Sequence, residues 1–459
     1  MYLVHRSLRS AASMIALSAM LGACSLIPDY ERPAMGAPAA FDGAAKTDSK
    51  ATVAADWWTA FKAPELEALM TDALANNLDI AAALARIDQA QGALRSTNSS
   101  LLPQVSASGS ATGADSSNNL KSNTRSASGD LSISYALDLW GKYRAQSAAS
   151  EASFRATQFD HDATVLLIQS SVATTYFNVL TLKDRLTITQ DSLKAALEIL
   201  NLVEQRYKFG AISALDLAQQ RANVATIQAG IPTIEDQLNS NRNALAILLG
   251  RAPEGFTVKT EGTAMLTLPT IAVGQPSSLL VRRPDIRRAE AQLQSANANI
   301  GAARAAFFPS LDLSAARSVD WVADIGTTNG SSIAASLLAP IFSGGSLEGS
   351  LQSAKAAKAE LVATYRKTVL TSFGEVENAM SSEDANARRV EALKVAADET
   401  RKAYDLSEES YKAGAIDFSS LLDAQRSWLS ARDSLAQARL AQYTAAVNLF
   451  IALGGGWQS

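Results

Sequence analysis

The chain has 459 residues, a formal net charge of -4 and an aromatic content of only 6%. The slight acidity gives no basis for nucleic-acid binding, which relies on basic patches. A composition rich in alanine and serine and poor in aromatic residues favours long helices packed through small side chains, rather than a bulky aromatic core.

The N-terminus carries a targeting segment. Arg6 and Arg9 precede an apolar run over residues 11–23 that is too short to span a bilayer, a pattern typical of a signal peptide at 1–23. The run ends in Leu-Gly-Ala before Cys24, which resembles the lipobox of bacterial lipoproteins, in which this cysteine is acylated. Because Ser25 rather than aspartate follows, the resemblance implies sorting to the outer membrane. Residues 24–63 are then a lipid-anchored tail.

Cys24 is the single cysteine of the chain, which excludes disulfides and cysteine-ligated metal sites. The alternative to lipidation is an ordinary signal peptide followed by a chance cysteine. A covalent lipid such as palmitate on Cys24 is the one attached group that we expect, with no cofactor and no metal.

The mature chain repeats itself. The segment Tyr-Lys-Phe-Gly-Ala-Ile at 207–212 recurs as Tyr-Lys-Ala-Gly-Ala-Ile at 411–416, and the register continues without a gap to Gly250 and Gly454. We therefore predict two copies of one unit, over 64–250 and 279–459. The residues between them, 251–278, form a connector that we expect to be a small mixed appendage.

Each copy predicts the same order of elements. In the first, leucines at steps of three and four predict a helix over 64–100, which Pro103 ends. A strand pair follows within 103–140: a Ser/Gly-rich strand over 104–115, a polar loop over 116–128, and an alternating strand through Leu131 to Leu139.

A very long helix comes next, over 142–207, without glycine or proline. At 1.5 Å per residue it is about 100 Å long, so it has to bury its apolar stripe against other helices. A return helix over 213–249 follows, with a break or kink expected at residues 230–232, which read Gly-Ile-Pro. The second copy predicts strands within 308–343, a long helix over 347–412 and an unbroken return helix over 417–453.

Four strands with one apolar side suit the wall of a membrane barrel but cannot close one, and open strand edges are not tolerated in lipid. Several chains must therefore combine: two would supply eight strands, three twelve and four sixteen. The alternative is a soluble four-stranded sheet packed on helices, which leaves the long helices and the outer-membrane sorting signal unexplained.

At this point the chain resembles the TolC/OprM outer-membrane factors, specifically the NodT-type efflux lipoproteins. The resemblance rests on Asp-Leu-Trp-Gly-Lys at 138–142, Arg-Arg-Pro-Asp-Ile at 282–286, Phe-Phe-Pro-Ser-Leu at 307–311 and Leu-Asp-Ala-Gln-Arg at 422–426. It implies a mainly α fold with a small β part and a homotrimer. In that trimer twelve strands form one outer-membrane β-barrel and twelve helices form an α-barrel in the periplasm.

The same resemblance implies a passive conduit of a tripartite efflux system, anchored in the outer membrane by its lipid. The expected partners are a periplasmic adaptor and a proton-driven inner-membrane pump. The alternatives are the exit duct of a type I-like protein or peptide secretion system, or a structural lipoprotein with no pore.

No catalytic constellation is visible, and we do not expect an enzyme. Of two histidines, His5 belongs to the signal segment and His161 stands alone on the long helix. The carboxylates are scattered at helical spacing beside lysine and arginine, as on solvated helix faces.

The two turns between the long and return helices are the first candidate site. A glycine suits the end of each long helix, and Ser213 and Asp417 suit the N-cap of each return helix. Two plain helical hairpins would account for these residues but not for a repeated, exposed Ala-Ile. In the resembled family an adaptor docks here, which implies contact residues Gly210, Ala211, Ile212, Gly414, Ala415 and Ile416.

The second candidate site is a periplasmic gate. The resemblance places Asp423 at the aperture, where threefold symmetry would bring three carboxylates together. It places Asp216 and Tyr411 where some relatives hold the closed state by bonds between helices, although Asp216 also fits a capping box with Ser213. Ser419 and Ser420 replace bulkier or acidic neighbours of the gate.

Overall fold

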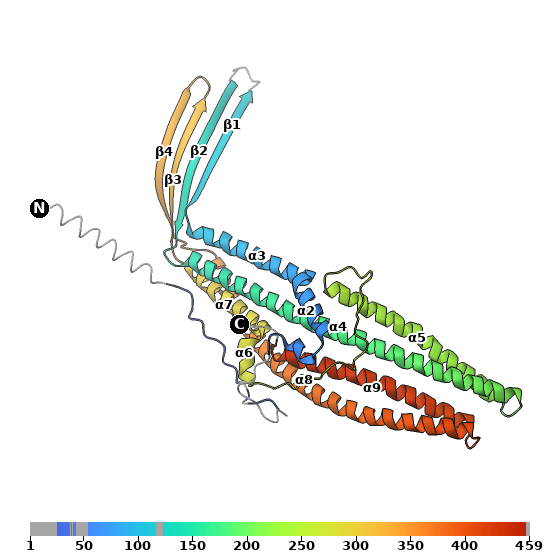
Figure 1. Ribbon diagram of the computed structural model, residues 1–459. Helices are drawn as coiled ribbons and strands as arrows, with labels where there is room; N and C mark the ends of the chain where they lie inside the picture. Colours follow the sequence, from blue (N-terminus) through green and yellow to red (C-terminus); the bar gives the residue numbers. More distant parts are fainter. Residues whose placement is uncertain (1–24, 37, 39, 43–53, 116–122, 456–459) are drawn as a thin grey trace. The chain divides into compact units, whose positions relative to one another are not determined.

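The structure is a computed structural model that describes residues 25–36, 38, 40–42, 54–115 and 123–455, so Cys24 lies outside the described residues. Its elements are shown in Figure 1. In chain order they are the 3₁₀ helix η1 (Trp57–Phe61), α2 (Pro64–Asn76), α3 (Leu78–Asn98), η2 (Ser99–Leu101), β1 (Gln104–Asp115), β2 (Asn123–Leu137), α4 (Lys142–Lys208), α5 (Ala214–Leu248), η3 (Pro276–Ser278), α6 (Leu279–Arg282), α7 (Pro284–Ala305), β3 (Ser310–Val322), β4 (Gly326–Leu338), α8 (Ser346–Lys412) and α9 (Phe418–Ala452).

The chain divides into two compact units, and α4 and α8 contribute residues to both. Unit 1 comprises the described part of 1–35 together with 85–159 and 286–368, and it contains the strands. Unit 2 comprises the described part of 36–84 together with 160–285 and 369–459, and it contains the return helices.

Unit 1 is built on one antiparallel sheet with the strand order β1-β2-β3-β4. Each strand pair of a repeat forms a hairpin, and the two repeats join where β2 pairs with β3, from Ser126 opposite Val322 to Leu137 opposite Leu311. The strands β1 and β4 are the edges of this sheet. In a single chain these edges carry unpaired backbone groups.

The register gives the sheet one apolar and one polar face. Odd-numbered residues pair with odd-numbered residues in all three ladders, so Ile133, Ala315 and Ile333 lie side by side on one face. The even face is rich in serine, and the Ser106 and Ser132 hydroxyls lie 2.7 Å apart across β1 and β2. Ile333 is 91% exposed despite its apolar side chain. Such a sheet is suited to lipid on one side and water on the other.

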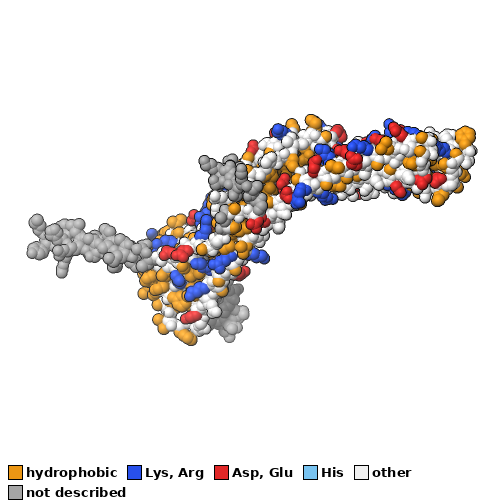
Figure 2. Space-filling view, turned by 90° about the horizontal axis from the view of Figure 1, so that it is seen from below, with side chains coloured by type: hydrophobic (Ala, Val, Ile, Leu, Met, Phe, Trp, Pro, Cys, Tyr) orange, Lys and Arg blue, Asp and Glu red, His pale blue; other side chains and the backbone are white. Residues whose placement is uncertain are grey.

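Unit 2 holds two helical hairpins, one formed by α4 and α5 and the other by α8 and α9 (Figure 1). Charged side chains of both signs are interspersed along these hairpins (Figure 2). Within the described residues, α4 is the one helix whose length and hydropathy would allow it to cross a membrane. Most of its apolar window is buried inside the protein, as in a core helix.

The core of unit 2 is aromatic, which corrects the expectation from composition. Phe61 is fully buried, and its ring centroid lies 5.0 Å from that of Phe177 and 6.2 Å from that of Phe450. Trp57 stacks on Phe450 at 5.3 Å. Several aromatic residues gather here, where η1 of the predicted tail packs against α4 and α9. The last part of the predicted tail is therefore part of the core.

The prediction that the connector over 251–278 forms a small mixed appendage is wrong, because no helix or strand lies between Leu249 and the short η3. The connector is instead held against α4 by hydrogen bonds that involve side chains of that helix. The Lys183 ammonium donates to the carbonyls of Val258 and Thr260 at 2.8 and 3.0 Å, and the Asp184 carboxylate accepts from the Thr263 amide at 2.9 Å. These polar partners replace the backbone hydrogen bonds that a helix or strand would supply.

Three further boundaries differ from the prediction. The helix over 64–100 is interrupted at Asn77, whose backbone is extended and whose side chain accepts from the amides of Asp79 and Ile80. The predicted loop over 116–128 is shorter, because β2 begins at Asn123 and its first polar residues pair with β1. The break expected at residues 230–232 is absent, because Pro232 lies inside the continuous helix α5, whereas a kink there stays a prediction.

Candidate functional site

The two tips between the paired helices have the same backbone. Gly210 and Gly414 adopt positive φ angles of 72° and 76°. At the first tip the Gly210 amide donates to the Tyr207 carbonyl and the Ala211 amide to the Arg206 carbonyl, both at 2.9 Å. This is the Schellman arrangement, in which glycine tolerates the left-handed conformation that ends a helix. The prediction of glycine-terminated helices is confirmed at both tips.

Side chains cap the return helices as predicted. The Ser213 hydroxyl accepts from the Asp216 amide at 3.2 Å, and the Asp216 carboxylate accepts from the Ser213 amide at 3.1 Å, which completes a capping box. At the second tip the Asp417 carboxylate accepts from the Ser420 amide at 2.9 Å and from the Ser419 hydroxyl at 3.1 Å. Hydrogen bonds from the Ser420 side chain, the Ser420 amide and the Ser419 side chain lower the pKa of Asp417.

The exposed surface of the tips differs in part from the expected Ala-Ile pair. The glycines and alanines at 210–211 and 414–415 are exposed, but Ile212 and Ile416 are half-buried against a cluster that contains Tyr411, Phe418 and Leu421. The large apolar group presented at the first tip is Phe209, which is 85% exposed. Hydrophobic side chains are visible at the hairpin tips at the right of Figure 2.

Arg206 links the two tips within one chain. Its guanidinium donates to the Lys412 carbonyl at 2.9 Å and lies 4.5 Å from the centre of the Tyr411 ring. It therefore satisfies a carbonyl at the end of α8 and stabilises the ring by a cation–π contact. Sequence reasoning missed Arg206, although an arginine in the last turn of a helix is a common signal for this role.

The predicted gate residues lie in two groups. Tyr411 is buried, and its hydroxyl has no hydrogen-bond partner in the part of the chain that the structure describes. Burial raises the pKa of Tyr411, the Arg206 guanidinium opposes that shift, and the Asp216 carboxylate adds to it. The Asp216 carboxylate bonds to Ser213, and among the described residues no hydrogen bond joins it to the Tyr411 hydroxyl.

Asp423, Ser419 and Ser420 are exposed on the first turns of α9. Leu422 and Ala424 on either side of Asp423 pack in the tip cluster, whereas the Asp423 side chain is exposed and faces away from it. The two serines are engaged at the N-cap of α9. A single chain cannot bring three copies of Asp423 together, so the aperture of carboxylates stays a prediction.

A groove above the second tip was not predicted. It has a volume of about 620 Å³, and α4 and α8 line its sides. Its base is Trp428, whose ring stacks on Tyr404 at 5.0 Å and is covered by the guanidinium of Arg401 at 4.4 Å. Burial raises the pKa of Tyr404 to about 12, so its hydroxyl stays neutral in water. Trp428, the one tryptophan of α9, was the sequence signal for this cluster.

Comparison with known proteins agrees with this architecture. The outer membrane efflux protein family matches residues 69–251 and 275–455. The pyoverdine export outer membrane protein OpmQ of Pseudomonas aeruginosa is 37% identical over 462 residues, which cover 97% of each chain. The cation efflux system protein CusC of Escherichia coli is 31% identical over 451 residues, covering 95% of this chain and 97% of CusC.

A solved structure shows the same fold. The MtrE outer membrane channel of Neisseria gonorrhoeae, in its open state, superposes with a TM-score of 0.82 at 28% identity, covering 94% of this chain and 98% of MtrE. The long helical hairpins and the four-stranded sheet are thus those of a channel with an α-barrel and a β-barrel, and the chain belongs to the outer membrane efflux protein family as an outer-membrane efflux channel.

Proposed function

We propose that the chain forms a passive homotrimeric conduit, anchored by a lipid in the outer membrane and coupled to an adaptor and an inner-membrane pump. The observation that carries this proposal is the two-faced sheet with unpaired edges at β1 and β4. Three chains supply twelve strands, and edge-to-edge closure then satisfies every backbone group in the barrel wall. No chemical step is assigned to the protein.

Conductance of the purified protein tests the conduit. We expect trimers in detergent by mass measurement, and discrete conductance steps after insertion into a planar bilayer. A stable water-soluble monomer, or a trimer that inserts without conducting, contradicts the proposal and favours the structural lipoprotein instead.

In this assembly the inner-membrane partner selects the cargo. The relatives OpmQ and CusC are named for different cargoes, pyoverdine and cations, although they are 37% and 31% identical to this chain. Similar channels thus serve different cargoes, which supports selection elsewhere in the assembly. Their names favour efflux over the protein-secretion alternative.

Lipid attachment at Cys24 is supported by the course of the first described residues in unit 1. The Pro28 carbonyl accepts from the Asn297 side chain at 2.7 Å, and Ile27 packs on Gly301, where an added Cβ would lie 2.6 Å from an Ile27 side-chain carbon. Arg304 donates to the Leu26 carbonyl at 3.4 Å, next to the end of α7 and shortly before β3. An acyl group on Cys24, two residues before Leu26, would then lie near the strands that enter the membrane.

The expected result for Cys24→Ala is the loss of metabolic labelling by radioactive palmitate, because no other cysteine exists in the chain. The matched control is Ser25→Ala, which leaves the thiol and should keep the label. Labelling that persists in Cys24→Ala would refute the lipobox interpretation, but it would not contradict the proposal that the protein is a conduit.

Adaptor docking at the tips is supported by the exposed small residues of both turns. We expect Ala211→Asp together with Ala415→Asp to abolish crosslinking to the adaptor, because burying two carboxylates in an apolar contact is strongly unfavourable. Trimer assembly should be unchanged, since both side chains are exposed. Ala211→Ser with Ala415→Ser is the control of similar size, and unchanged crosslinking of the aspartate variant would contradict docking at these residues.

The carboxylate aperture at Asp423 predicts a further measurable effect. We expect Asp423→Ala to raise the conductance of the closed channel and to reduce its cation preference, because three like charges at one constriction select cations. Asp417→Asn is a control at a nearby carboxylate that caps α9 instead. Equal conductance and selectivity of Asp423→Ala and the unmodified channel would exclude a role in the aperture.

A further inference from the structure

Within one chain the two repeats meet at a joint between β2 and β3. Where these strands run into the helices, Leu137 lies opposite Leu311, and both side chains are half-buried. Just beyond this pair, the Trp140 ring stacks on Phe308 at 4.7 Å, and its indole N–H donates to the Pro309 carbonyl at 2.8 Å. The internal joint therefore consists of an aliphatic pair followed by an aromatic pair.

The duplication predicts a second joint of this kind, between β4 of one chain and β1 of the next. Successive strands are antiparallel, so β4 runs in the direction of β2, and β1 runs in the direction of β3. Gln104 and Ser310 each follow a proline, and they pair with Ser134 and Leu338 respectively. Equivalent residues are therefore 206 positions apart in β1 and β3, and 204 positions apart in β2 and β4.

This equivalence gives the register between chains. Leu137 and Leu311 of the internal joint correspond to Ile341 and to Val105 of the next chain. Their counterparts are half-buried, but Ile341 is 93% exposed and Val105 is 65% exposed in the single chain. The strand β4 also ends at Leu338, whereas β2, which is paired on both sides, continues to Leu137. The end of β4 is therefore incomplete without a second chain.

The aromatic pair has no direct equivalent at the second joint. Gly344 occupies the position of Trp140, and Leu102 occupies the position of Phe308. Leu102 is 63% exposed in the single chain, and a glycine at position 344 of the neighbouring chain has no side chain that could cover it. A cover for Leu102 has to come from another residue.

A phenylalanine lies close to this gap. Phe342 stands two residues before Gly344 and is 92% exposed. It occupies the position of Asp138, whose carboxylate accepts from the Tyr143 and Arg144 amides at the start of α4, at 3.0 and 2.9 Å. Phenylalanine cannot accept such bonds. A strand that continued to position 342 would place the ring on the even, serine-rich face of the sheet, which lipid does not cover. Neither capping nor contact with lipid thus explains this phenylalanine.

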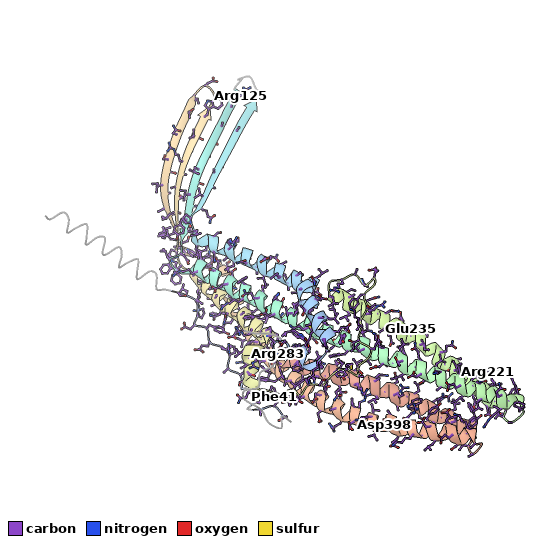
Figure 3. All side chains as sticks on the ribbon, in the orientation of Figure 1. Phe41, Arg125, Arg221, Glu235, Arg283 and Asp398 are labelled. Atoms are coloured by element: carbon purple, nitrogen blue, oxygen red, sulfur yellow. The ribbon has the colours of Figure 1, made fainter. Side chains whose placement is uncertain are left out.

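We propose that Ile341 and Phe342 extend β4 along β1 of the next chain, with Ile341 opposite Val105 and the Phe342 ring over Leu102. The register makes Phe342 and Leu102 diagonal neighbours on one face, a separation that an aromatic side chain spans. Pairing satisfies backbone groups at the ends of both edge strands and removes these exposed apolar side chains from solvent. This apolar joint rests on the proposed trimer. It lies at the end of the sheet opposite to Arg125, which Figure 3 labels.

Disulfide formation between neighbouring chains tests the register. We expect Ile341→Cys with Val105→Cys, in the full-length protein in detergent, to give a covalent trimer on oxidation with copper phenanthroline. Opposite residues of antiparallel strands are about 4.5–5.5 Å apart at Cα, a separation that a disulfide spans. The band at three times the chain mass should disappear with a reductant. Each single variant retains the native Cys24 and should give no such band.

Two further cysteine pairs make this test specific. Ile341→Cys with Ala107→Cys keeps the same face but shifts the pairing by two residues, so it should crosslink much less. Leu137→Cys with Leu311→Cys forms its bond within one chain and should leave the band at the mass of the monomer. Crosslinking through position 107 in preference to 105, in a protein that is trimeric by mass, would overturn the register and leave the conduit intact. A monomeric unmodified protein would overturn both.

Removal of the apolar side chains tests their contribution to assembly. We expect Ile341→Ser with Phe342→Ser to lower the fraction of trimers that survive heating in mild detergent by at least about tenfold, because two large apolar side chains lose their burial. The far-ultraviolet circular dichroism should be unchanged, since both side chains are exposed in the single chain. Ile325→Ser is the matched control, because this side chain is 80% exposed in the turn between β3 and β4, at the other end of the sheet. Equal survival of the trimers of the two variants would overturn the apolar joint.

Discussion

Truncation of Phe61 to alanine is expected to lower the free energy of unfolding of unit 2 by about 3–5 kcal/mol, because it removes a fully buried ring and leaves a cavity. The ring lies at the centre of the aromatic cluster and contacts Trp57, Phe177, Tyr443 and Phe450, with centroid distances of 5.0 to 6.4 Å. It is supplied by η1, from the segment that the sequence predicted to be a tail. The variant therefore tests whether this segment belongs to the core.

The midpoint of thermal unfolding, followed by far-ultraviolet circular dichroism in detergent, measures the effect. Phe209→Ala is the matched control, because its ring is 85% exposed and its removal leaves no cavity. We expect a clear loss for Phe61→Ala and almost none for Phe209→Ala. Similar midpoints for the two variants would show that η1 does not stabilise the core.

The repeats and their long elements were predictable because a periodic pattern persists over many residues. The predicted helices over 142–207 and 347–412 differ from α4 and α8 by one residue at a single end. The strands were predictable where apolar residues alternate, as from Leu131 to Leu137. Such patterns report which face of an element is buried, and that is a local property.

The errors arose where a partner distant in sequence decides the local structure. Asn77 interrupts a helix whose leucine pattern continues through it, because its side chain bonds both to the next helix and to Leu248. The first residues of β2 are polar and resemble a loop, but pairing with β1 makes them a strand. Pro232 does not end α5, and the buried side chains of Ile227 and Ile234 lie on either side of it in the sequence.

The helix-ending glycines and the N-cap residues at the tips were predictable, whereas the exposure of the side chains there was not. Glycine at the end of a helix and serine or aspartate at an N-cap depend on immediate neighbours in sequence. The burial of Ile212 and Ile416 depends on the cluster that both hairpins form, and the contact of Arg206 with Tyr411 joins residues of different repeats. The composition likewise could not show that aromatic residues would gather in clusters such as the one around Phe61.

Among the glycines, Gly250 should tolerate substitution least. It ends α5 with a positive φ of 66°, and a Cβ there would lie 2.2 Å from the Asn76 carbonyl oxygen. Alanine would add the strain of a left-handed residue, about 1–2 kcal/mol. Its Cβ would also clash with the Asn76 carbonyl, a backbone group that cannot rotate away as a side chain can. We expect Gly250→Ala to lower the free energy of unfolding by more than about 3 kcal/mol, in the range of severely destabilising substitutions.

Two other glycines separate the strain from the collision. Gly454 holds the equivalent position after α9 with φ of 74°, and a Cβ there would lie 3.2 Å from the Arg282 carbonyl oxygen, which a small shift can relieve. Gly210 has φ of 72° and nothing within 4 Å, so alanine there meets the strain alone. The midpoint of thermal unfolding should therefore fall most for Gly250→Ala, less for Gly454→Ala and least for Gly210→Ala. Equal losses at the three positions would mean that the left-handed backbone alone requires glycine at position 250. The end of α5 would then pack less closely against the end of α2 than the structure indicates.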